Sequence, residues 1–451
     1  MRAVMKFGGG ILTDAGSLER LAAIVQSRAK RSNVLVVSAV NGVTDRLIAF
    51  LDGGVDDEGS VERFIDETAS RHEIMLAGIT ADAAFADSIR KLGRLLYGIC
   101  YTQEVSERIR NLALSFGERL AAIMVARKLA ASGIKARELF AEQAGIVAAA
   151  GLASGACRFA ETRQNIGTIT GLLNQGIVPV ITGFYGIDAN GDVVLFGRGG
   201  TDYSAGIMAK VLDADLLEVW KDVPGFLSAD PKLIPQARKL DEISFSEAEE
   251  LGYFGAKILH PRTIDCIRGT KVTAHICNFF DPDARGTRIV AKRQRRNRVS
   301  SVSCKDGICV ISVASGAMVG VPGVLGRLFG TLAESGIVVD AVSTSQVAIA
   351  FTIDRHDLPN ALQVLGQLQG SIIESVQVFE NAALIGIVGE EFMANDGMAA
   401  RILSSVAQAG VRPLMILDPA SNNSISLVTK SADAQKAARA IYSSLGLGDA
   451  A

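Results

Sequence analysis

The first 290 residues alternate short apolar runs with longer segments of helical periodicity, and this alternation constrains the fold more than any other feature of the chain. Runs rich in Val, Ile and Leu occupy residues 3–7, 33–40, 176–183, 192–196 and 215–220, and segments such as 17–30 and 106–133 separate them. Continuous apolar strands joined by helical crossovers are typical of a largely parallel sheet that is covered on both faces. We therefore predict an α/β domain over residues 1–290, with ligands bound at the carboxyl ends of its strands.

Composition limits the class of protein further. The chain has 451 residues, of which 49% are hydrophobic and 21% charged, so it can bury about two to four domain cores. We find no apolar run as long as a membrane span and no secretory signal at the N-terminus, so we expect a cytoplasmic protein with no membrane partner. Six cysteines without C-x-x-C spacing and four histidines predict neither a disulfide framework nor a protein-bound metal site. A formal net charge of −2 argues against a nucleic-acid partner.

The C-terminal part contains two copies of one small unit. Residues 326–353 and 400–429 both follow the order helix, glycine, strand, turn, strand, with Arg327 and Gly336 matching Arg401 and Gly410 at a constant offset. This pattern predicts a β-α-β-β-α-β fold that carries no obvious catalytic residues, so a regulatory binding module and a purely structural dimerisation module both remain open. A basic stretch without aromatic residues predicts a linker at 291–305. We place the two units at 306–380 and 381–451, with the strand near 306–313 as a candidate to pair into the second unit.

Two glycine-rich stretches of the first domain combine flexible backbone with positive charge. In "VMKFGGG", Lys6 ends an apolar strand and three glycines follow, so successive backbone N–H groups can form an anion-binding nest. In "LFGRGGTDYSAG", Arg198 stands between glycines, and its planar guanidinium suits a carboxylate or a phosphate. From these residues alone, ordinary tight turns with surface charges remain alternatives.

The combination of motifs is more specific than either stretch. In chain order they are "KFGGG", "VVSAVNGVTD", "LSFGERLAA", "GRGGTDY", "EVWKDVPGFLSADPKLIP" and "GAKILHP". Together they resemble the aspartate kinases of the amino-acid kinase superfamily. These ATP-dependent enzymes phosphorylate the β-carboxylate of L-aspartate, the first step toward lysine, threonine and methionine. The resemblance covers nearly the whole chain and implies an amino-acid kinase fold followed by two ferredoxin-like ACT domains. It also implies ATP and Mg²⁺ as cofactors and a homodimer or larger homo-oligomer.

The resemblance assigns roles residue by residue. The catalytic residues it implies are Lys6, Asp202 and Lys257. The substrate-binding residues are Thr44, Glu118, Arg198, Gly199, Gly200 and Thr201. The nucleotide-binding residues are Lys6, Gly8, Gly9, Lys221, Asp222, Leu227, Lys232, Lys257 and Ile258. The effector-binding residues are Met318, Val321, Gly323, Val324, Leu325, Asp340, Thr344 and Ser345.

The implied chemistry needs no general base, because a carboxylate nucleophile is already ionised at neutral pH. Catalysis then consists of positioning and charge neutralisation. His260 is therefore expected to pack or cap a helix, and Trp220 to lie in the core. The "VSTSQV" turn resembles that of lysine-regulated members, which favours L-lysine as the effector and L-threonine second.

Four positions depart from the family pattern. Gly10 and Ile11 replace a frequent Thr-Ser pair, Lys221 replaces a frequent threonine, and Lys232 replaces a frequent arginine. Two alternatives to a monofunctional aspartate kinase therefore remain open. One is a catalytically weak amino-acid-sensing protein on a kinase scaffold, and the other is a superfamily member that acts on a different acidic substrate.

Overall fold

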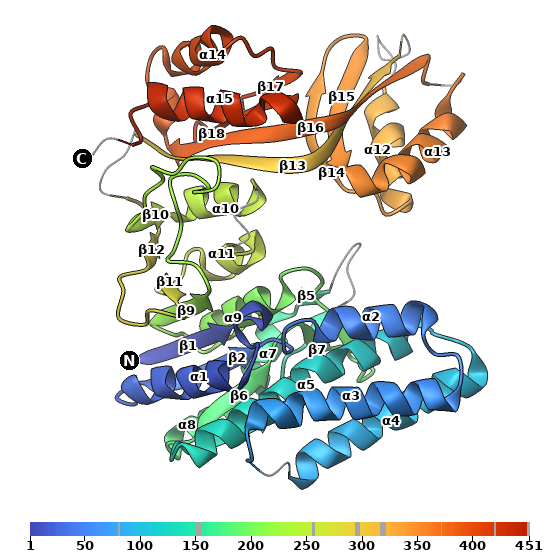
Figure 1. The fold of residues 1–451 in the computed structure, drawn as a ribbon, viewed down its shortest axis with the longest axis vertical. Helices are drawn as coiled ribbons and strands as arrows, with labels where there is room; N and C mark the ends of the chain where they lie inside the picture. Colours follow the sequence, from blue (N-terminus) through green and yellow to red (C-terminus); the bar gives the residue numbers. More distant parts are fainter. Residues whose placement is uncertain are drawn as a thin grey trace. The chain divides into compact units, whose positions relative to one another are not determined.

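The computed structural model of the chain describes residues 1–79, 82–149, 155–254, 258–293, 298–315, 322–370, 372–418 and 421–448. Two compact units emerge, the first made of Met1–Phe226 with Ile258–Ala291 and the second of Leu227–Lys257 with Lys292–Ala451 (Figure 1). Among the described residues, no helix combines the length and apolar character that a membrane crossing requires.

The first unit is built on a mostly parallel sheet. Its strands lie in the spatial order β3, β6, β2, β1, β9, β11, β12, and only β11 and β12 pair antiparallel. This arrangement confirms the predicted α/β architecture. One predicted strand differs, because residues 193–195 form β8 of a small antiparallel hairpin with β7 and not a strand of the main sheet. The strands of the unit are β1 (Arg2–Phe7), β2 (Ser32–Val37), β3 (Ala136–Leu139), β4 (Ala148–Ala149), β5 (Ala156–Cys157), β6 (Val178–Thr182), β7 (Tyr185–Ile187), β8 (Val193–Leu195), β9 (Leu216–Lys221), β11 (Thr273–Asn278) and β12 (Thr287–Val290).

Helices cover both faces of this sheet (Figure 1). Because side chains alternate along a strand, Lys6 faces one side, where α9 contacts β1, and Phe7 faces the other, where α1 packs. Trp220 is fully buried and stacks on Phe7 with ring centroids 6.0 Å apart, as expected for a core residue. The helices are α1 (Ala15–Ser27), α2 (Val43–Gly53), α3 (Glu58–Leu76), α4 (Ala83–Thr102), α5 (Glu107–Ala131), α6 (Ala141–Ala144), α7 (Phe159–Asn165), α8 (Gly167–Asn174), α9 (Gly200–Val211) and α11 (Pro261–Ile267), with a 3-10 turn η1 (Gly9–Ile11).

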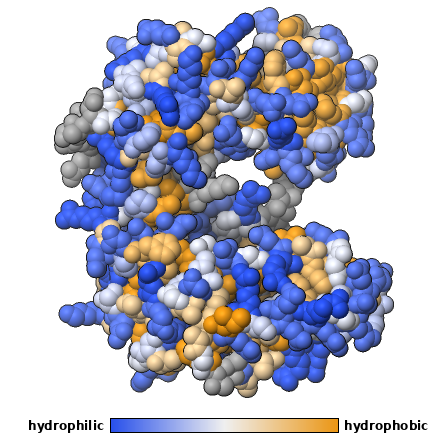
Figure 2. All heavy atoms as spheres, viewed as in Figure 1, coloured by the Kyte–Doolittle hydropathy of each residue, from blue (hydrophilic) through white to orange (hydrophobic). Residues whose placement is uncertain are grey.

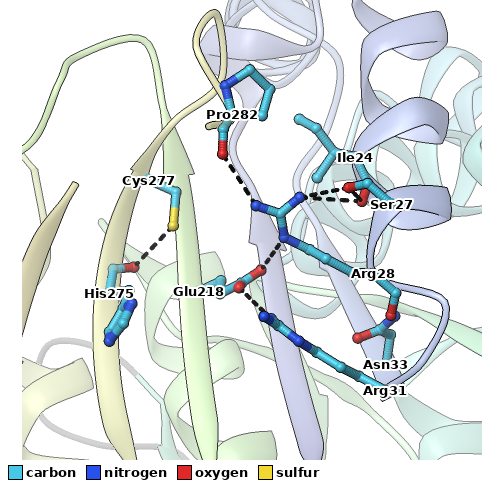
Figure 3. Close-up of polar contacts among 9 residues, drawn as sticks. All are labelled: Ile24, Ser27, Arg28, Arg31, Asn33, Glu218, His275, Cys277 and Pro282. Carbon is cyan, nitrogen blue, oxygen red and sulfur yellow. Dashed lines mark hydrogen bonds and ion pairs between the residues drawn. The ribbon is translucent and has the colours of Figure 1, made fainter. Parts of the chain in front are cut away.

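A buried ion cluster ties the end of α1 to the sheet on the face opposite Lys6 (Figure 3). The carboxylate of Glu218 in β9 lies 2.7 Å from a guanidinium nitrogen of Arg31 and 3.4 Å from Nε of Arg28. Arg28 also donates to the carbonyl of Pro282 at 3.2 Å and lies 4.7 Å from the centre of the Trp220 ring. The cluster therefore joins three segments that are distant in sequence, which points to a structural role.

The second unit contains one antiparallel sheet in the order β14, β15, β13, β16, β18, β17. Two long strands, β13 (Arg298–Ala314) and β16 (Ser375–Glu390), cross both halves of this sheet. The other strands of this sheet are β14 (Val339–Thr344), β15 (Ala348–Asp354), β17 (Met415–Leu417) and β18 (Ser424–Lys430). The short strand β10 (Glu242–Ser244) falls within the residues of this unit but is not part of this sheet. The helices are α10 (Phe245–Tyr253), α12 (Val324–Glu334), α13 (Leu358–Leu368), α14 (Met398–Gln408) and α15 (Ser431–Ser444), with 3-10 turns η3 (Arg355–Asp357) and η4 (Phe392–Ala394).

The two predicted repeats are present in this unit. Helices α12 and α14 are each followed by a glycine with positive φ, Gly336 and Gly410, and then by an edge strand. Their boundaries differ from our expectation. The predicted linker at 291–305 is extended backbone from Arg298 onward, because β13 begins there. The early half of β13 pairs with residues 384–390 of the second repeat, whereas residues 308–314 pair with β15 of the first.

Residues 227–257 belong to the second unit, although we predicted a first domain that is continuous to residue 290. Specific bonds hold this segment there. Val302 donates to the carbonyl of Ser228 at 2.9 Å, and the Ser228 hydroxyl lies 2.8 Å from that of Tyr442. At the start of α10, the fully buried carboxylate of Glu247 pairs with Arg293 at 2.8 Å. A buried carboxylate requires such a partner, so α10 is anchored to the ACT-type sheet.

The Glu218 cluster generates a stability prediction. Glu218→Ala should lower the unfolding free energy of the first unit by about 3 kcal/mol, because it leaves two guanidinium groups without their buried carboxylate. Trp220 is the single tryptophan of the chain, so its fluorescence during urea unfolding reports on this unit. Asp87→Ala, which removes an exposed partner of Arg90 and Lys91, is the control and should change little. Equal effects of the two substitutions would contradict the assigned role of Glu218.

Candidate functional site

Three charged side chains converge at the carboxyl end of the central strands. Nζ of Lys6, near the end of β1, lies 2.6 Å from one carboxylate oxygen of Asp202 in the first turn of α9. Nζ of Lys221, the last residue of β9, lies 3.5 Å from the other oxygen. Lys6 and Asp202 are buried, and the Lys221 side chain is 17% exposed. The cluster thus holds two ammonium groups and one carboxylate.

Burial and charge act in opposite directions on these groups. Burial lowers the pKa of Lys6 to about 8, Asp202 opposes this shift, and Lys221 adds to it. Burial alone would raise the pKa of Asp202, but the two lysines outweigh it and hold that pKa below its ordinary value. The cluster contains two basic side chains and one acidic one, an excess of basic groups that favours binding of an anion.

A second buried group, Glu118 of α5, lies at the end of β2. Its Oε1 accepts a hydrogen bond from the backbone N–H of Ala39 at 3.1 Å, and its Oε2 has no hydrogen-bond partner among the described residues. The residue is 2% exposed. Burial raises the pKa of Glu118 to about 8, although the hydrogen bonds from Ala39 and Ser38 oppose the shift. A buried carboxylate with a free oxygen is suited to receive a cationic ligand group.

Hydroxyl groups connect the two charged regions. Oγ of Ser38, which follows β2, lies 3.3 Å from Oγ1 of Thr201 in α9, and the Ser38 side chain also hydrogen-bonds Glu118. Thr44 lies beside them, because a Cβ atom added at Gly117 would be 3.7 Å from its Oγ1 and 2.8 Å from Cβ of Ala39. The helix α5 therefore approaches the end of β2 closely only because residue 117 is glycine.

The glycine turns hold the backbone close to these groups. Gly199 has φ of 70°, and a Cβ atom there would lie 2.3 Å from the imidazole of His260, so no other residue fits. His260 caps α11 by accepting from the N–H of Arg262 at 3.3 Å, in the packing and capping role expected for it. A Cβ atom at Gly8 would lie 2.7 Å from Nζ of Lys6. Arg198 is exposed and forms no hydrogen bond or ion pair with any described residue.

Two neighbours of the site were absent from the sequence prediction. Ser38 lies inside the quoted "VVSAVNGVTD" block, whose predicted contact was Thr44 alone. Arg262 holds the Arg198 turn from outside by donating to the carbonyls of Phe196 at 2.8 Å and Gly155 at 2.6 Å. Only its position after "HP" in the last motif could have drawn attention to it.

The structure brings most of the predicted first-domain residues together and leaves others apart. Lys6, Gly8, Gly9, Lys221 and Asp222 lie at the ends of β1 and β9, and Asp222 is exposed. Of the remaining nucleotide residues, Ile258 belongs to the first unit, whereas Leu227 and Lys232 belong to the second. Lys257, Met318 and Val321 lie outside the described residues.

The described effector residues lie on two elements of the second unit. Gly323 caps the start of α12 and has φ of 91°, and Val324 and Leu325 form the first turn. Asp340 and Thr344 lie on β14, and Ser345 follows that strand. Asp340 is ion-paired with Lys305 at 2.5 Å, and the cavity it lines contains none of the other described effector residues.

Taken together, the first-unit groups can bind a small molecule with several charges. The Lys6–Asp202–Lys221 cluster and the N-terminus of α9 favour a phosphate group. Glu118 favours an ammonium group, and Arg198 has its five N–H donors available for a carboxylate. None of these groups is placed as a general base. The arrangement fits charge neutralisation around a transferring phosphoryl group.

Comparison with known protein families supports this chemistry. The Amino acid kinase family matches residues 1–278, and the ACT domain matches residues 311–368 and 385–445.

Individual relatives cover almost the whole chain. The chain is 30% identical over 465 residues to Aspartokinase 2, chloroplastic, of Arabidopsis thaliana, covering 98% of this chain and 84% of the relative. It is 28% identical over 460 residues to the Lysine-sensitive aspartokinase 3 of Escherichia coli (strain K12), covering 98% of both. The crystal structure of E. coli aspartokinase III in complex with aspartate and ADP superposes with a TM-score of 0.85 at 25% identity, over 99% of this chain and 100% of that one.

Glu118 generates a second stability prediction. The pKa of its carboxyl is about 4.5 in the unfolded chain and about 8 in the folded chain. Between these pH values, the folded protein keeps a proton that the unfolded chain has lost. The unfolding free energy therefore falls as pH rises from about 4.5 to about 8. Glu118→Gln cannot ionise. The stability of this variant relative to the parent should therefore increase between about pH 4.5 and pH 8, by on the order of several kcal/mol, since one pKa unit is about 1.4 kcal/mol.

Trp220 fluorescence during urea unfolding at a series of pH values measures this difference. Glu107→Gln, at an exposed position of the same helix, is the matched control. A stability difference between Glu118→Gln and the parent that stays constant across this pH range would rule out a buried, ionisable Glu118.

Proposed function

Because the chain belongs to the aspartokinases of the amino acid kinase family, we propose that it transfers the γ-phosphoryl group of ATP to the β-carboxylate of L-aspartate, forming 4-phospho-L-aspartate and ADP. The observation that carries this proposal is the separation of a buried lysine cluster and a buried carboxyl group at one end of the sheet. The Lys6–Asp202–Lys221 cluster favours an anion, and Glu118 favours a cation. L-Aspartate and ATP together present an ammonium cation and phosphate anions to these two groups. The product is the first intermediate toward lysine, threonine and methionine.

L-Aspartate has one ammonium and two carboxylate groups for the site to distinguish. In our proposal, Glu118 receives the α-ammonium and Arg198 binds the α-carboxylate with two parallel hydrogen bonds. Thr44 and Thr201 donate to carboxylate oxygens, and Gly199 and Gly200 let the backbone approach. The β-carboxylate is then directed toward the lysine cluster as the nucleophile, already ionised at neutral pH.

The nucleotide is proposed to bind at the ends of β1 and β9. Lys6 and Lys221 contact its phosphates, the N–H groups of Gly8 and Gly9 donate to the same oxygens, and Asp202 orients both lysines. Lys257, Leu227, Lys232 and Ile258 complete the nucleotide site by resemblance to the family. These cations offset the charge that accumulates on the transferred phosphoryl group and on the leaving ADP.

Mg²⁺ fits this site as an ion carried by the nucleotide. Among the described residues, no group of three or more acidic, histidine or cysteine side chains could hold a metal, and Asp202 is already paired with two lysines. Asp222, exposed at the end of β9, is the nearby carboxylate without a cationic partner in the described chain. Mg²⁺ commonly binds phosphates with one or two protein carboxylates, and when bound it supplies further charge neutralisation.

The two alternative functions are less well supported. A sensing protein without catalysis would not need two lysines to share one buried carboxylate, or Glu118 to remain buried with one oxygen unpartnered among the described residues, because such groups destabilise a fold. A kinase for another acidic substrate is not favoured by the aspartokinase relatives, which match over 98% of this chain.

The second unit is proposed to regulate the kinase by binding an amino acid. The E. coli relative is named lysine-sensitive, and the structure of that aspartokinase III in complex with lysine and aspartate superposes with a TM-score of 0.80 at 26% identity. We therefore propose L-lysine as the effector, with L-threonine second. The start of α12 and the strand β14 contribute its binding residues, which are Met318, Val321, Gly323, Val324, Leu325, Asp340, Thr344 and Ser345.

A homodimer is proposed to form through the first ACT-type repeat. Leu325, Val338, Val342 and Val347 are between 40% and 65% exposed. Figure 2 shows hydrophobic residues gathered on the repeat that carries α12 and β15. Edge strands and exposed apolar residues favour association with a second copy. Light scattering coupled to size-exclusion chromatography distinguishes a dimer from a monomer.

A hydroxylamine-trapping assay tests the proposed function directly. Hydroxylamine converts an acyl phosphate to a hydroxamate, whose complex with ferric ion is coloured, so ATP, Mg²⁺ and L-aspartate should yield product, whereas L-glutamate should not. Added L-lysine should reduce the rate. Product with glutamate but not with aspartate would refute the proposed substrate.

Arg198→Ala should weaken L-aspartate binding and spare ATP binding. Loss of a charge-assisted pair that the substrate shields from water costs on the order of 2–5 kcal/mol, which should appear as a large increase in KM for aspartate. Steady-state kinetics with each substrate varied in turn measures both effects. Arg94→Ala, at an exposed position on α4, is the control. An unchanged KM for aspartate would remove Arg198 from the site.

Lys6→Ala should lower kcat much more than it raises KM for aspartate, because the ammonium is proposed to act on the phosphates and not on the acceptor. Lys30→Ala, at an exposed position after α1, is the control. Trp220 fluorescence checks that the variant is folded. Turnover within about threefold of the parent, which is less than 1 kcal/mol of transition-state stabilisation, would disprove the phosphate role.

A further inference from the structure

The second unit holds a cavity of about 500 Å³, and Asp340 is the one lining residue that the proposed function already uses. Its lining comes from α10, from the edge strands β14 and β17, and from β16 and β18. Both ACT-type repeats and the inserted segment 227–257 therefore contribute to one cavity within a single chain. Its volume lies in the range that proteins use for small organic ligands.

The lining has more negative than positive charge. Glu250, Asp340 and Asp418 line the cavity. Asp340 is neutralised by Lys305, whose Nζ lies 2.5 Å from its carboxylate. Glu250 and Asp418 have no cationic partner in the part of the chain that the structure describes. The charge balance of the cavity therefore favours a cation.

A serine hydroxyl also lines the cavity. Ser426 of β18 is 6% exposed, and its side chain forms no hydrogen bond with any described residue. Ser424, two positions earlier and hence on the same face of the strand, hydrogen-bonds the Glu250 carboxylate. A hydroxyl that lines a cavity can donate to or accept from a ligand atom, so the Ser426 side chain adds a polar contact to this wall.

The remaining wall is apolar and well supported. Phe254, Leu384 and Ile416 form part of it. Phe254 is 3% exposed and lies directly over the backbone of β16, because a Cβ atom at Gly386 would be 2.3 Å from its ring. This packing favours a wall that keeps its shape when a ligand leaves.

Lys305 illustrates the ligand chemistry that the cavity accepts. Its alkylammonium group binds Asp340 and lies 5.7 Å from the centre of the Tyr253 ring. Asp340 is directed by an irregularity of β14 between Val339 and Val342, where the N–H of Ala341 donates to the Thr352 hydroxyl at 3.0 Å. Such bulges commonly re-aim a side chain next to a site.

We propose that this cavity binds a small organic molecule with a primary ammonium group and an apolar tail, the ammonium bound by Glu250 and Ser426 and the tail packed on Phe254, Leu384 and Ile416. This site goes beyond the proposed kinase function. It also differs from the proposed effector site in needing no ligand carboxylate. Phe254 stands three residues before Lys257, a predicted catalytic residue, in the sequence.

Isothermal titration of the full chain with n-pentylamine tests the proposal, with 1-pentanol as the uncharged control ligand. We expect saturable binding of one n-pentylammonium per chain and none of 1-pentanol. Glu250→Gln should weaken binding by about tenfold or more, because it removes the charge-assisted bond. Ser426→Ala should weaken it by a smaller factor. Glu334→Gln, at an exposed position of α12, should bind like the parent.

Other outcomes overturn the proposal. These are the absence of saturable n-pentylamine binding to the parent chain, equal binding of 1-pentanol, and unchanged binding in Glu250→Gln. If Glu250→Gln unfolds, as thermal unfolding would reveal, Ser426→Ala decides alone, and unchanged binding in that variant refutes the site. The titration contains no ATP or aspartate, so its result is independent of whether the kinase assay succeeds.

Discussion

Two lysines share one buried carboxylate at the end of the central strands, and the organisation of the first unit follows from this arrangement. Asp202 lies between Lys6 and Lys221, so one carboxylate serves two ammonium groups. Burial lowers the pKa of Lys6, and Asp202 only partly opposes this shift. The parallel sheet makes the arrangement possible, because β1 and β9 are neighbours and end at the same edge. The carboxylate of Asp202 comes from the first turn of α9, a helix that packs on β1.

The buried carboxyl group of Glu118 lies nearby, and burial raises its pKa to about 8. Its side chain is buried with one free oxygen, which disfavours the folded state at neutral pH. A structural residue would gain from having a partner at that position. A residue that must receive a ligand's ammonium cannot have one, because the ligand would then have to displace it. The site thus gives up some stability to keep a carboxyl group available for binding, a relationship common in enzymes.

The course of the chain links catalysis and regulation covalently. The segment 227–257 leaves the first unit after Phe226, packs into the second through Ser228 and Glu247, and returns at Ile258. The end of α10 lies within this segment and lines the cavity of the second unit. A ligand that changes the packing of α10 can therefore act on both chain connections at once. In the proposed function, such coupling explains why the ACT-type repeats and the kinase fold occur in one chain.

The sequence determined the layers of the fold because strand and helix periodicities are local properties. The apolar runs at 3–7, 33–40, 176–183 and 215–220 became β1, β2, β6 and β9, and the repeated helix-glycine-strand pattern became two ACT-type halves. The run at 192–196 is equally apolar but pairs in a hairpin. Its partner is chosen by neighbouring segments, which its own residues do not reveal.

The site residues also divide into those that sequence motifs indicated and those that only the tertiary structure brought together. Motifs indicated Lys6, Glu118, Arg198 and Asp202, because glycine-rich turns and charges are visible in the sequence. Only the tertiary structure decided that Lys221 shares Asp202 with Lys6, that Ser38 joins Thr201 to Glu118, and that residues 227–257 pack with the C-terminal unit. These contacts join residues far apart in the chain. Their energies depend on burial and distance, which a sequence pattern does not contain.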